Sequence, residues 1–259
     1  MRSKQMHKHN ICLLLLVLGF PLFSMGNNKA EDFFLKGNKE YAKADYEGAL
    51  KTYQQLLDDG YESAEVYFNI GNSNYKLGNM PSAILNYEKA HKLNPGDEDI
   101  ELNLQLANLK ITDKIEPVPE FFLATWWRSI VLFFSVSLWS ILGIVTITLG
   151  FLLLIVYLFA LALPIKKSAF YTGICLIFIG VLSIIMSEIQ QAYFSRHQEA
   201  IVFAGTVNVK SGPDASQKTL FVIHEGTKVS IKNKNQNWIE VELPNGNTGW
   251  ITLSDVKEI

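Results

Sequence analysis

Hydrophobic positions divide the chain into stretches of three kinds. Long apolar runs occupy residues 11–23, 129–165 and 168–187. Between residues 30 and 97, small and aromatic residues recur every 34 positions, whereas beyond Glu188 apolar and polar residues alternate. Apolar runs are typical of membrane or leader helices. A long fixed period is typical of repeat proteins, and alternation of apolar and polar residues is typical of strands. The pattern predicts a helical repeat, an apolar middle and a C-terminal β-domain.

The first apolar run has the features of a secretory signal peptide. Residues 1–10 are basic and polar, 13 apolar residues follow, and small residues come next at Ser24 and Gly26. We expect cleavage after Gly26, so that residues 1–26 form the signal peptide. The alternative is an uncleaved anchor helix, although the run is short for a span of about 20 residues.

The second and third apolar runs predict two membrane-spanning helices. Residues 129–165 carry no charge and, at about 1.5 Å per residue, would exceed a ~30 Å hydrocarbon core. Aromatic residues beside Arg128 place the start of this run at the membrane interface. The expected bounds are a linker and interfacial helix at 113–137, a first span at 138–163 and a second span at 168–187.

The connection between the spans predicts their orientation. Lys166 and Lys167 lie in this tight loop, and the positive-inside rule places the loop in the cytoplasm. Both flanking blocks would then face outward, in agreement with export by a signal peptide. The expected location is the cytoplasmic (inner) membrane, crossed more than once, with both terminal domains in the periplasm.

The N-terminal block repeats without a gap. The recurring pairs are Gly37 and Gly71, Asn38 and Asn72, Tyr41 and Tyr75, Ala49 and Ala83, and Tyr53 and Tyr87, and Pro95 closes the second unit. This pattern resembles the tetratricopeptide repeat family, whose units are helical hairpins. The units would be residues 30–63 and 64–97, within an all-α block at 27–112 that ends in a capping helix.

Close helix packing explains the residue types. Two helices approach closely only where a side chain is small, and the tyrosines fill the volume beside those positions. The expected packing residues are Gly37, Ala49, Gly71, Ala83 and Pro95. We expect the capping helix to pack through Ile100, Leu102, Leu104, Leu106 and Leu109. Glu88 is expected on a solvated face.

By resemblance, the first helix of each repeat lines a concave groove for peptide segments. The residues expected there are Glu31, Phe34, Asn38, Tyr41, Glu65, Phe68, Asn69, Asn72, Tyr75 and Lys76. The alternative is that such side chains are core, which we prefer for Tyr53 and Tyr87 and leave open for the asparagines. Residues 27–120 hold 17 acidic residues and 10 lysines, so a basic or apolar partner is expected and nucleic acid is not.

The alternation beyond Glu188 predicts a small β-domain at residues 200–259. Strands are expected at Ala200–Val209, Leu220–Ile223 and Thr227–Ile231, and a hairpin turns at Asn245-Gly246. The motif residues are Asn208, Lys210, Gly212, Pro213, Gly226, Trp238, Gly246, Gly249 and Trp250. They resemble those of bacterial SH3-like domains, with Lys210 in place of the usual arginine. Related domains bind wall peptides or short protein segments, and a purely structural role is equally open. Trp250 is expected in the core.

Catalytic signatures are missing from the sequence. There is no phosphate-binding loop, H-E-x-x-H or C-x-x-C, and the five histidines lack metal-ligand spacing. Cys12 and Cys175 both lie inside apolar runs. We expect no catalytic residue, no metal and no cofactor, and hence a protein that is not an enzyme.

The order of segments resembles the BatE-like family of the Bacteroides aerotolerance operon. The resemblance implies a multidomain membrane protein with an all-α tetratricopeptide repeat, a two-helix transmembrane hairpin and a small all-β SH3-like barrel. It also implies a scaffold in an envelope complex linked to oxidative-stress tolerance, beside Bat-type von Willebrand A and tetratricopeptide membrane proteins. The alternative function is a wall-anchoring module that binds peptidoglycan peptides through the SH3-like domain.

Overall fold

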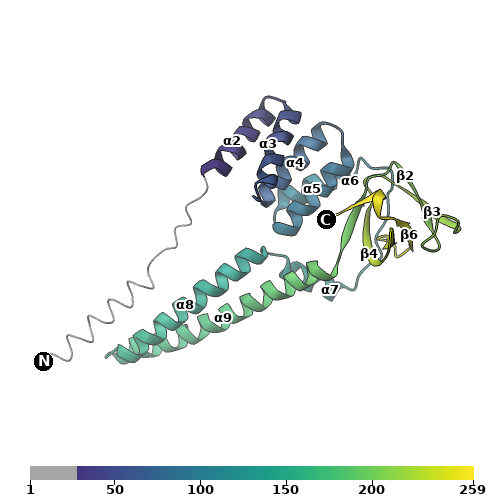
Figure 1. Ribbon diagram of the computed structural model, residues 1–259. Coiled ribbons are helices and arrows are strands. Elements are labelled where there is room, and N and C mark those ends of the chain that lie inside the picture. The colour runs from purple at the N-terminus through teal and green to yellow at the C-terminus, as the bar shows by residue number, and fades with distance from the viewer. Residues whose placement is uncertain (1–27) are drawn as a thin grey trace. The chain divides into compact units, whose positions relative to one another are not determined.

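The computed structural model describes residues 28–259, so the expected signal peptide lies outside the described residues. The helices of the N-terminal block are α2 (Asn28–Ala42), α3 (Tyr46–Asp58), α4 (Ala64–Lys76), α5 (Met80–Leu93) and α6 (Glu98–Asn108) (Figure 1). The starts of α3 to α6 are set by Asp45, Ser63, Asn79 and Asp97, whose side chains accept hydrogen bonds from backbone N–H groups of the first turn.

Glycine and tyrosine make the same contact in both helical hairpins. A Cβ atom on Gly37 would lie 2.5 Å from the ring of Tyr53, and one on Gly71 would lie 2.6 Å from the ring of Tyr87. Both tyrosines are fully buried. A larger residue at either glycine would have to displace a buried ring, which a close-packed interior resists. The 34-residue period therefore reflects one packing contact used twice.

Helix α6 packs through fewer residues than the sequence suggests. Ile100 is buried and Leu104 is partly buried. Leu102, Leu106 and Leu109 are 53%, 41% and 70% exposed, so the expectation that they pack against the repeat is wrong. A helix turns residues at this spacing toward one side, and here that side faces away from the preceding hairpin.

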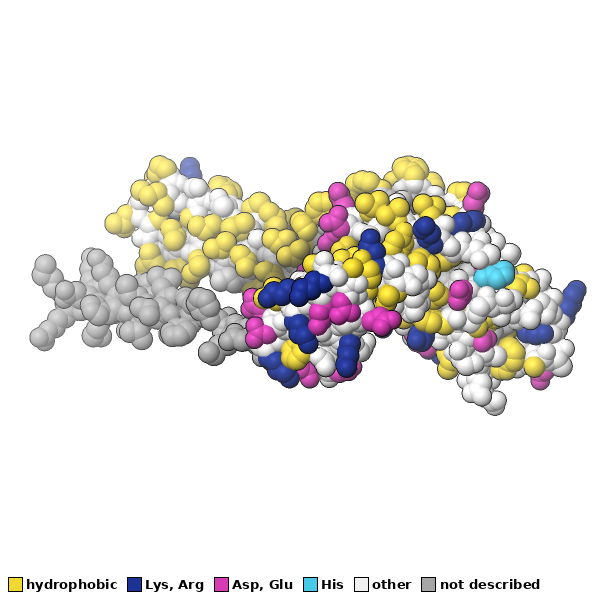
Figure 2. Space-filling view, turned by 90° about the horizontal axis from the view of Figure 1, so that it is seen from above, with side chains coloured by type: hydrophobic (Ala, Val, Ile, Leu, Met, Phe, Trp, Pro, Cys, Tyr) yellow, Lys and Arg dark blue, Asp and Glu magenta, His cyan; other side chains and the backbone are white. Residues whose placement is uncertain are grey.

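Three helices follow the repeat: α7 (Phe122–Val131), α8 (Val136–Phe159) and α9 (Leu163–Arg196). Helices α8 and α9 are long and apolar enough to cross a membrane, with mean hydropathies of 2.7 and 2.4 over their most apolar windows. They lie side by side, and Figure 2 shows almost no charged side chain along them. The connection is residues 160–162, so Lys166 and Lys167 lie in the first turns of α9 and not in the loop. Pro164 suits a helix start, because its fixed φ matches the first turn.

Two glycines on each helix allow α8 and α9 to approach closely. A Cβ atom on Gly150 would lie 2.8 Å from the carbonyl oxygen of Gly173, and one on Gly180 would lie 2.9 Å from that of Gly143. The glycines are seven residues apart on both helices, a spacing that puts small residues on one face. The Ser140 and Ser187 hydroxyls are 2.8 Å apart at the same interface.

The C-terminal residues form a seven-stranded antiparallel sheet in the order β3-β2-β6-β5-β4-β1-β7. The strands are β1 (Glu199–Val202), β2 (Thr206–Lys210), β3 (Thr219–His224), β4 (Lys228–Asn235), β5 (Trp238–Glu242), β6 (Thr248–Thr252) and β7 (Val256–Glu258). The single strand expected at Ala200–Val209 is wrong: it is two strands, and β1 pairs with β4 and β7 while β2 pairs with β3 and β6. With the helical repeat, the apolar helix pair and this all-β domain, the predicted fold class is confirmed.

Candidate functional site

The first helices of the repeat present a partly polar surface, here called the first-helix face. Every residue expected in the groove has an exposed or partly exposed side chain. Among residues 33–259, this face consists of Phe34, Asn38, Tyr41, Glu65, Phe68, Asn69, Asn72, Tyr75 and Lys76. Glu65 and Lys76 are the most open of these, and both rise from α4.

The asparagines of this face also support the core. The Asn38 Oδ1 atom accepts hydrogen bonds from the Tyr53 hydroxyl at 2.7 Å and from the Asn69 Nδ2 atom at 3.1 Å. The Asn72 Oδ1 atom accepts one from the Tyr87 hydroxyl at 2.8 Å. Burial raises the pKa of Tyr53 to about 12 and raises that of Tyr87 as well. Both phenols therefore keep their protons and donate, and the two asparagines stabilise the repeat in addition to lining its surface.

The aromatic residues of the first-helix face are half core and half open. The rings of Phe34 and Tyr53 are 6.2 Å apart, and those of Phe68 and Tyr87 are 5.8 Å apart. One period after Phe68, Asn72 and Tyr75 come Leu102, Leu106 and Leu109, the exposed leucines of α6 and of its C-cap. The face thus turns from polar to apolar at its third helix. The 34-residue period could have located this apolar end.

The opposite side of the repeat carries the β-domain, which packs on α5. Ile201 of β1 is fully buried in one cluster with Ala83, Ile84 and Leu85 of α5. Phe203 and Ile259 pack against the same cluster. The repeat and the β-domain therefore share an apolar core, a contact that the sequence reasoning missed because each domain was treated by itself.

A partly buried ion-pair triad joins the two domains beside this core. The Lys228 Nζ atom lies 2.9 Å from a carboxylate oxygen of Glu88 and 2.8 Å from one of Glu199. Burial disfavours the charged lysine, but the two carboxylates more than offset this, so the pKa of Lys228 is raised. Glu88 is 7% exposed. The expectation that Glu88 is solvated is wrong, because the β-domain packs on α5 and Lys228 of β4 pairs with Glu88.

The linker after α6 provides a second polar contact with the β-domain. The Asp113 carboxylate accepts hydrogen bonds from the backbone N–H of His224 at 2.7 Å and from the Thr227 hydroxyl at 2.6 Å, and it lies 2.8 Å from the His224 Nδ1 atom. Burial would raise the pKa of Asp113, but these hydrogen bonds together hold it below its ordinary value. Gly226 lies between His224 and Thr227 in the chain. Its φ of +85° and its contact with Ile111 leave no space for a side chain.

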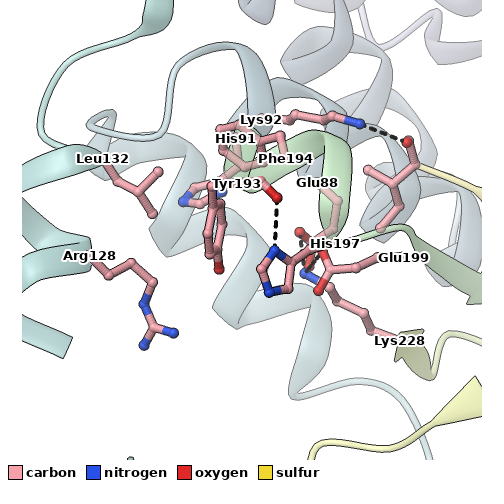
Figure 3. Close-up of a pocket in the computed structure, with 11 residues that line it drawn as sticks. Glu88, His91, Lys92, Arg128, Leu132, Tyr193, Phe194, His197, Glu199 and Lys228 are labelled. Carbon is pink, nitrogen blue, oxygen red and sulfur yellow. Dashed lines mark hydrogen bonds and ion pairs between the residues drawn. The ribbon is translucent and has the colours of Figure 1, made fainter. Parts of the chain in front are cut away.

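A cavity of about 170 Å³ lies where α5, α7, α9 and the β-domain meet. In Figure 3, Glu88, Glu199 and Lys228 point toward one another, and Arg128 lies apart from them. Arg128 instead pairs with Glu120 at 2.9 Å. His91 also lines the cavity, and burial lowers its pKa, which favours the neutral imidazole at neutral pH. Arg128 and Lys228 are thus paired with carboxylates, and the Lys92 Nζ atom donates to the Ile259 backbone oxygen at 3.1 Å, which makes this cavity a structural junction.

The outer face of the β-sheet carries both tryptophans of the SH3-like motif. In β6, Gly249 and Ile251 point to the core, so Trp250 points the other way and is partly exposed. The expectation that Trp250 belongs to the core is therefore wrong. Trp250 lies opposite Lys210 and Glu240 in the neighbouring strands, and Trp238 is on the same face. The remaining motif residues are structural or loop positions: Gly246 has a φ of +84°, a Cβ on Gly249 would lie 2.5 Å from Val209, Gly212 is buried, and Asn208 and Pro213 are exposed.

Among residues 28–259 there is no group of three or more histidine, cysteine, aspartate or glutamate side chains that could hold a metal ion. Cys175 is an exposed free thiol on α9, within an apolar segment. Three surfaces of the described residues are candidate functional features: the first-helix face, the outer face of the sheet, and the apolar surface of α8 and α9.

Comparisons with known proteins identify both domain types. Residues 64–97 match the tetratricopeptide repeat family, and residues 205–257 match the bacterial SH3 domain family. The chain is also 27% identical over 86 residues to YrvJ of Bacillus subtilis (strain 168), whose name describes an N-acetylmuramoyl-L-alanine amidase. That match spans 33% of this chain but only 16% of YrvJ, and it falls mainly in the SH3 part. Tetratricopeptide and bacterial SH3 domains are non-catalytic binding modules that act in protein–protein or peptidoglycan interactions.

Proposed function

We propose that this protein is a non-enzymatic scaffold, anchored in the cytoplasmic membrane by α8 and α9, that presents the first-helix face to a partner protein outside the cytoplasm. The observation that supports this function is the position of the β-domain on α5. Because it occupies the second-helix side, the first-helix face keeps its exposed and half-exposed aromatic, amide and charged side chains. Aromatic anchors with polar surroundings are typical of protein-binding surfaces.

The proposed partners are membrane proteins of the Bat type, with von Willebrand A or tetratricopeptide domains, in an envelope complex that supports aerotolerance. This assignment follows from the resemblance of the segment order to the BatE-like family. The open leucines at the α6 end of the first-helix face favour a partner segment with an apolar side chain at that end.

Charge exchange on the first-helix face tests the scaffold proposal. The double substitution Glu65→Lys with Lys76→Glu alters two exposed positions without changing net charge. We expect it to reduce co-purification of membrane partners about fivefold, equivalent to ~1 kcal/mol. The matched control is Lys218→Glu with Glu225→Lys, two exposed positions of the β-domain. Equal capture by both variants would exclude the first-helix face as the recruiting surface.

Thiol labelling of intact cells tests the proposed topology. In a variant without Cys12 and Cys175, cysteines introduced at Ser63 and Asn245 should react with a membrane-impermeant reagent added from outside. A cysteine at Ser168, beside the lysines that start α9, should not react. Labelling of Ser168 from outside would reverse the proposed orientation.

A second candidate function is anchoring to the cell wall through the outer face of the sheet. Trp238 and Trp250 lie on this face, and the similarity to a wall-amidase protein falls mainly in this domain. Co-sedimentation with purified sacculi decides between the two functions. Wall anchoring requires that wild type sediments with sacculi and that Trp250→Ala abolishes this; the scaffold function requires neither.

A further inference from the structure

A groove of about 520 Å³ lies on the second-helix side of the repeat, at the edge of the β-domain. Its walls come from α3, α4 and α5, from Phe203, which follows β1, and from Lys257 of the edge strand β7. The volume falls within the range of ~300–1,000 Å³ that is usual for ligand sites. This groove is separate from the first-helix face on which the proposed function rests.

The charge of the groove is opposite to that of the block around it. Its charged lining residues are Lys51, Lys89 and Lys257, and no carboxylate among residues 28–259 lines it, although residues 27–120 carry 17 acidic residues against 10 lysines. Two carboxylates contact lining residues of the groove: Asp58 accepts a hydrogen bond from Gln54 at 3.0 Å, and Glu62 is hydrogen-bonded to Tyr67. Both already have a polar partner.

Aromatic rings hold two of the three ammonium groups in place. The Lys89 Nζ atom lies 5.5 Å from the centre of the Tyr67 ring, and the Lys257 Nζ atom lies 4.2 Å from that of Phe203. Such contacts orient a cation without neutralising it. Two lysines are therefore positioned but keep their charge available for an anion.

Side-chain amides complete the lining. Gln54, Asn74 and Asn86 belong to three different helices and offer donors and acceptors that suit a peptide backbone. The Asn74 Nδ2 atom donates to the Ile70 carbonyl at 2.9 Å and the Asn86 Nδ2 atom to the Ser82 carbonyl at 2.8 Å. These bonds fix both amides against their own helices, so the site is preorganised.

We propose that this groove, which requires both the repeat and the β-domain, binds an extended acidic segment of a partner protein. Two or three carboxylates of the segment would meet the lysines, and its backbone would meet the amides. Because the β-domain supplies Lys257 and Phe203, the site would exist only while that domain is docked on α5.

Fluorescence anisotropy on the full chain in a non-ionic detergent tests this proposal. The probe is a fluorescein-labelled hexapeptide of alternating Glu and Ala, and the matched probe replaces each Glu with Gln. We expect binding of the Glu peptide only, weakened by raising NaCl from about 0.05 M to 0.5 M, because salt screens exposed charges. Each of Lys51→Gln, Lys89→Gln and Lys257→Gln should raise its dissociation constant about threefold or more, and the triple variant should abolish binding.

The control for general charge effects is the triple variant Lys43→Gln, Lys110→Gln and Lys218→Gln, which removes the same charge from exposed positions outside the groove and outside the first-helix face. It should bind the Glu peptide like wild type. Equal loss in both triple variants, or equal binding of both peptides, would overturn the site. The opposing result is displacement of the labelled Glu peptide by a soluble peptidoglycan stem peptide at a lower concentration than unlabelled Glu peptide requires. That result would overturn the assignment to a protein segment and make this a wall-peptide site. Loss of partner capture on the first-helix face would not affect these outcomes.

Discussion

Helices α3 and α5 are the second helices of two successive repeats, yet they have different surroundings. Leu50 and Gln54 of α3 correspond to Ile84 and Glu88 of α5, one period of 34 residues later. Leu50 is partly exposed and Gln54 is exposed, whereas Ile84 is fully buried and Glu88 is 7% exposed. The difference comes from the β-domain, which covers α5 and leaves α3 to line the lysine-bearing groove. A repeat period thus predicts which residues share a helix face but does not predict what covers that face.

Truncation of the paired apolar residues should show the largest difference between the two helices. Ile84→Ala removes side-chain volume from the core shared with β1, so it should lower the free energy of unfolding by about 2–5 kcal/mol. Leu50→Ala, at a partly exposed position, should cost about 1 kcal/mol. Thermal unfolding of the full chain in detergent, followed by circular dichroism, measures both. Equal shifts would contradict docking of the β-domain on α5.

The polar pair, Glu88 of α5 and Gln54 of α3, should show a smaller difference in stability than the apolar pair, again with the greater loss on α5. Glu88→Ala leaves Lys228 half-buried with Glu199 as its one remaining carboxylate, so the expected loss of stability is ~1–3 kcal/mol. Gln54→Ala should stay within about 0.5 kcal/mol, as is usual for exposed positions.

A double-mutant cycle isolates the contact itself. If Glu88 and Lys228 interact across the domains, the Glu88→Ala and Lys228→Ala effects should not add, because each substitution removes the same pair. Strict additivity would mean that the two domains are not joined through this triad.

Local patterns made most of the fold predictable. The repeated Gly37 and Gly71 marked the places where the tyrosine rings pack, and the uncharged runs marked α8 and α9. Asn245-Gly246 marked a turn, since Gly246 has the positive φ that such hairpins need. Each of these signals depends on neighbours in the chain or on a single period.

The features that the sequence did not reveal are contacts between distant segments. Lys228, the partner of Glu88, is 140 residues away in the chain, and His224, a partner of Asp113, is 111 residues away. The local sequence around Glu88 and Asp113 does not indicate either contact. A tryptophan in a strand suggests core, but Trp250 is partly exposed because Gly249 and Ile251 occupy the core side. The seven-residue glycine spacing of α8 and α9 is a signal in the sequence from which their close approach could be predicted.

The smallest expected effect concerns pH and the contact between Asp113 and the β-domain. The pKa of Asp113 is lower in the folded chain than its ordinary value of 3.8. As the pH falls, the unfolded chain therefore binds a proton at Asp113 before the folded chain does. The stabilisation by the charged Asp113 carboxylate is present above about pH 3.8 and disappears as the pH falls through the folded pKa. Asp113→Asn keeps one acceptor oxygen but has no charge, so it should be slightly less stable than wild type at neutral pH.

The gap between Asp113→Asn and wild type should narrow as the pH falls below about 3.8, because wild type then loses the charge that the variant never had. The measurement is the midpoint of thermal unfolding at a series of pH values in detergent. Glu116→Gln is the matched control for removal of a charge, since Glu116 is exposed in the same linker, and at neutral pH it should cost less stability than Asp113→Asn. A constant gap for Asp113→Asn across the series would show that its carboxylate does not hold the β-domain against the linker by charge.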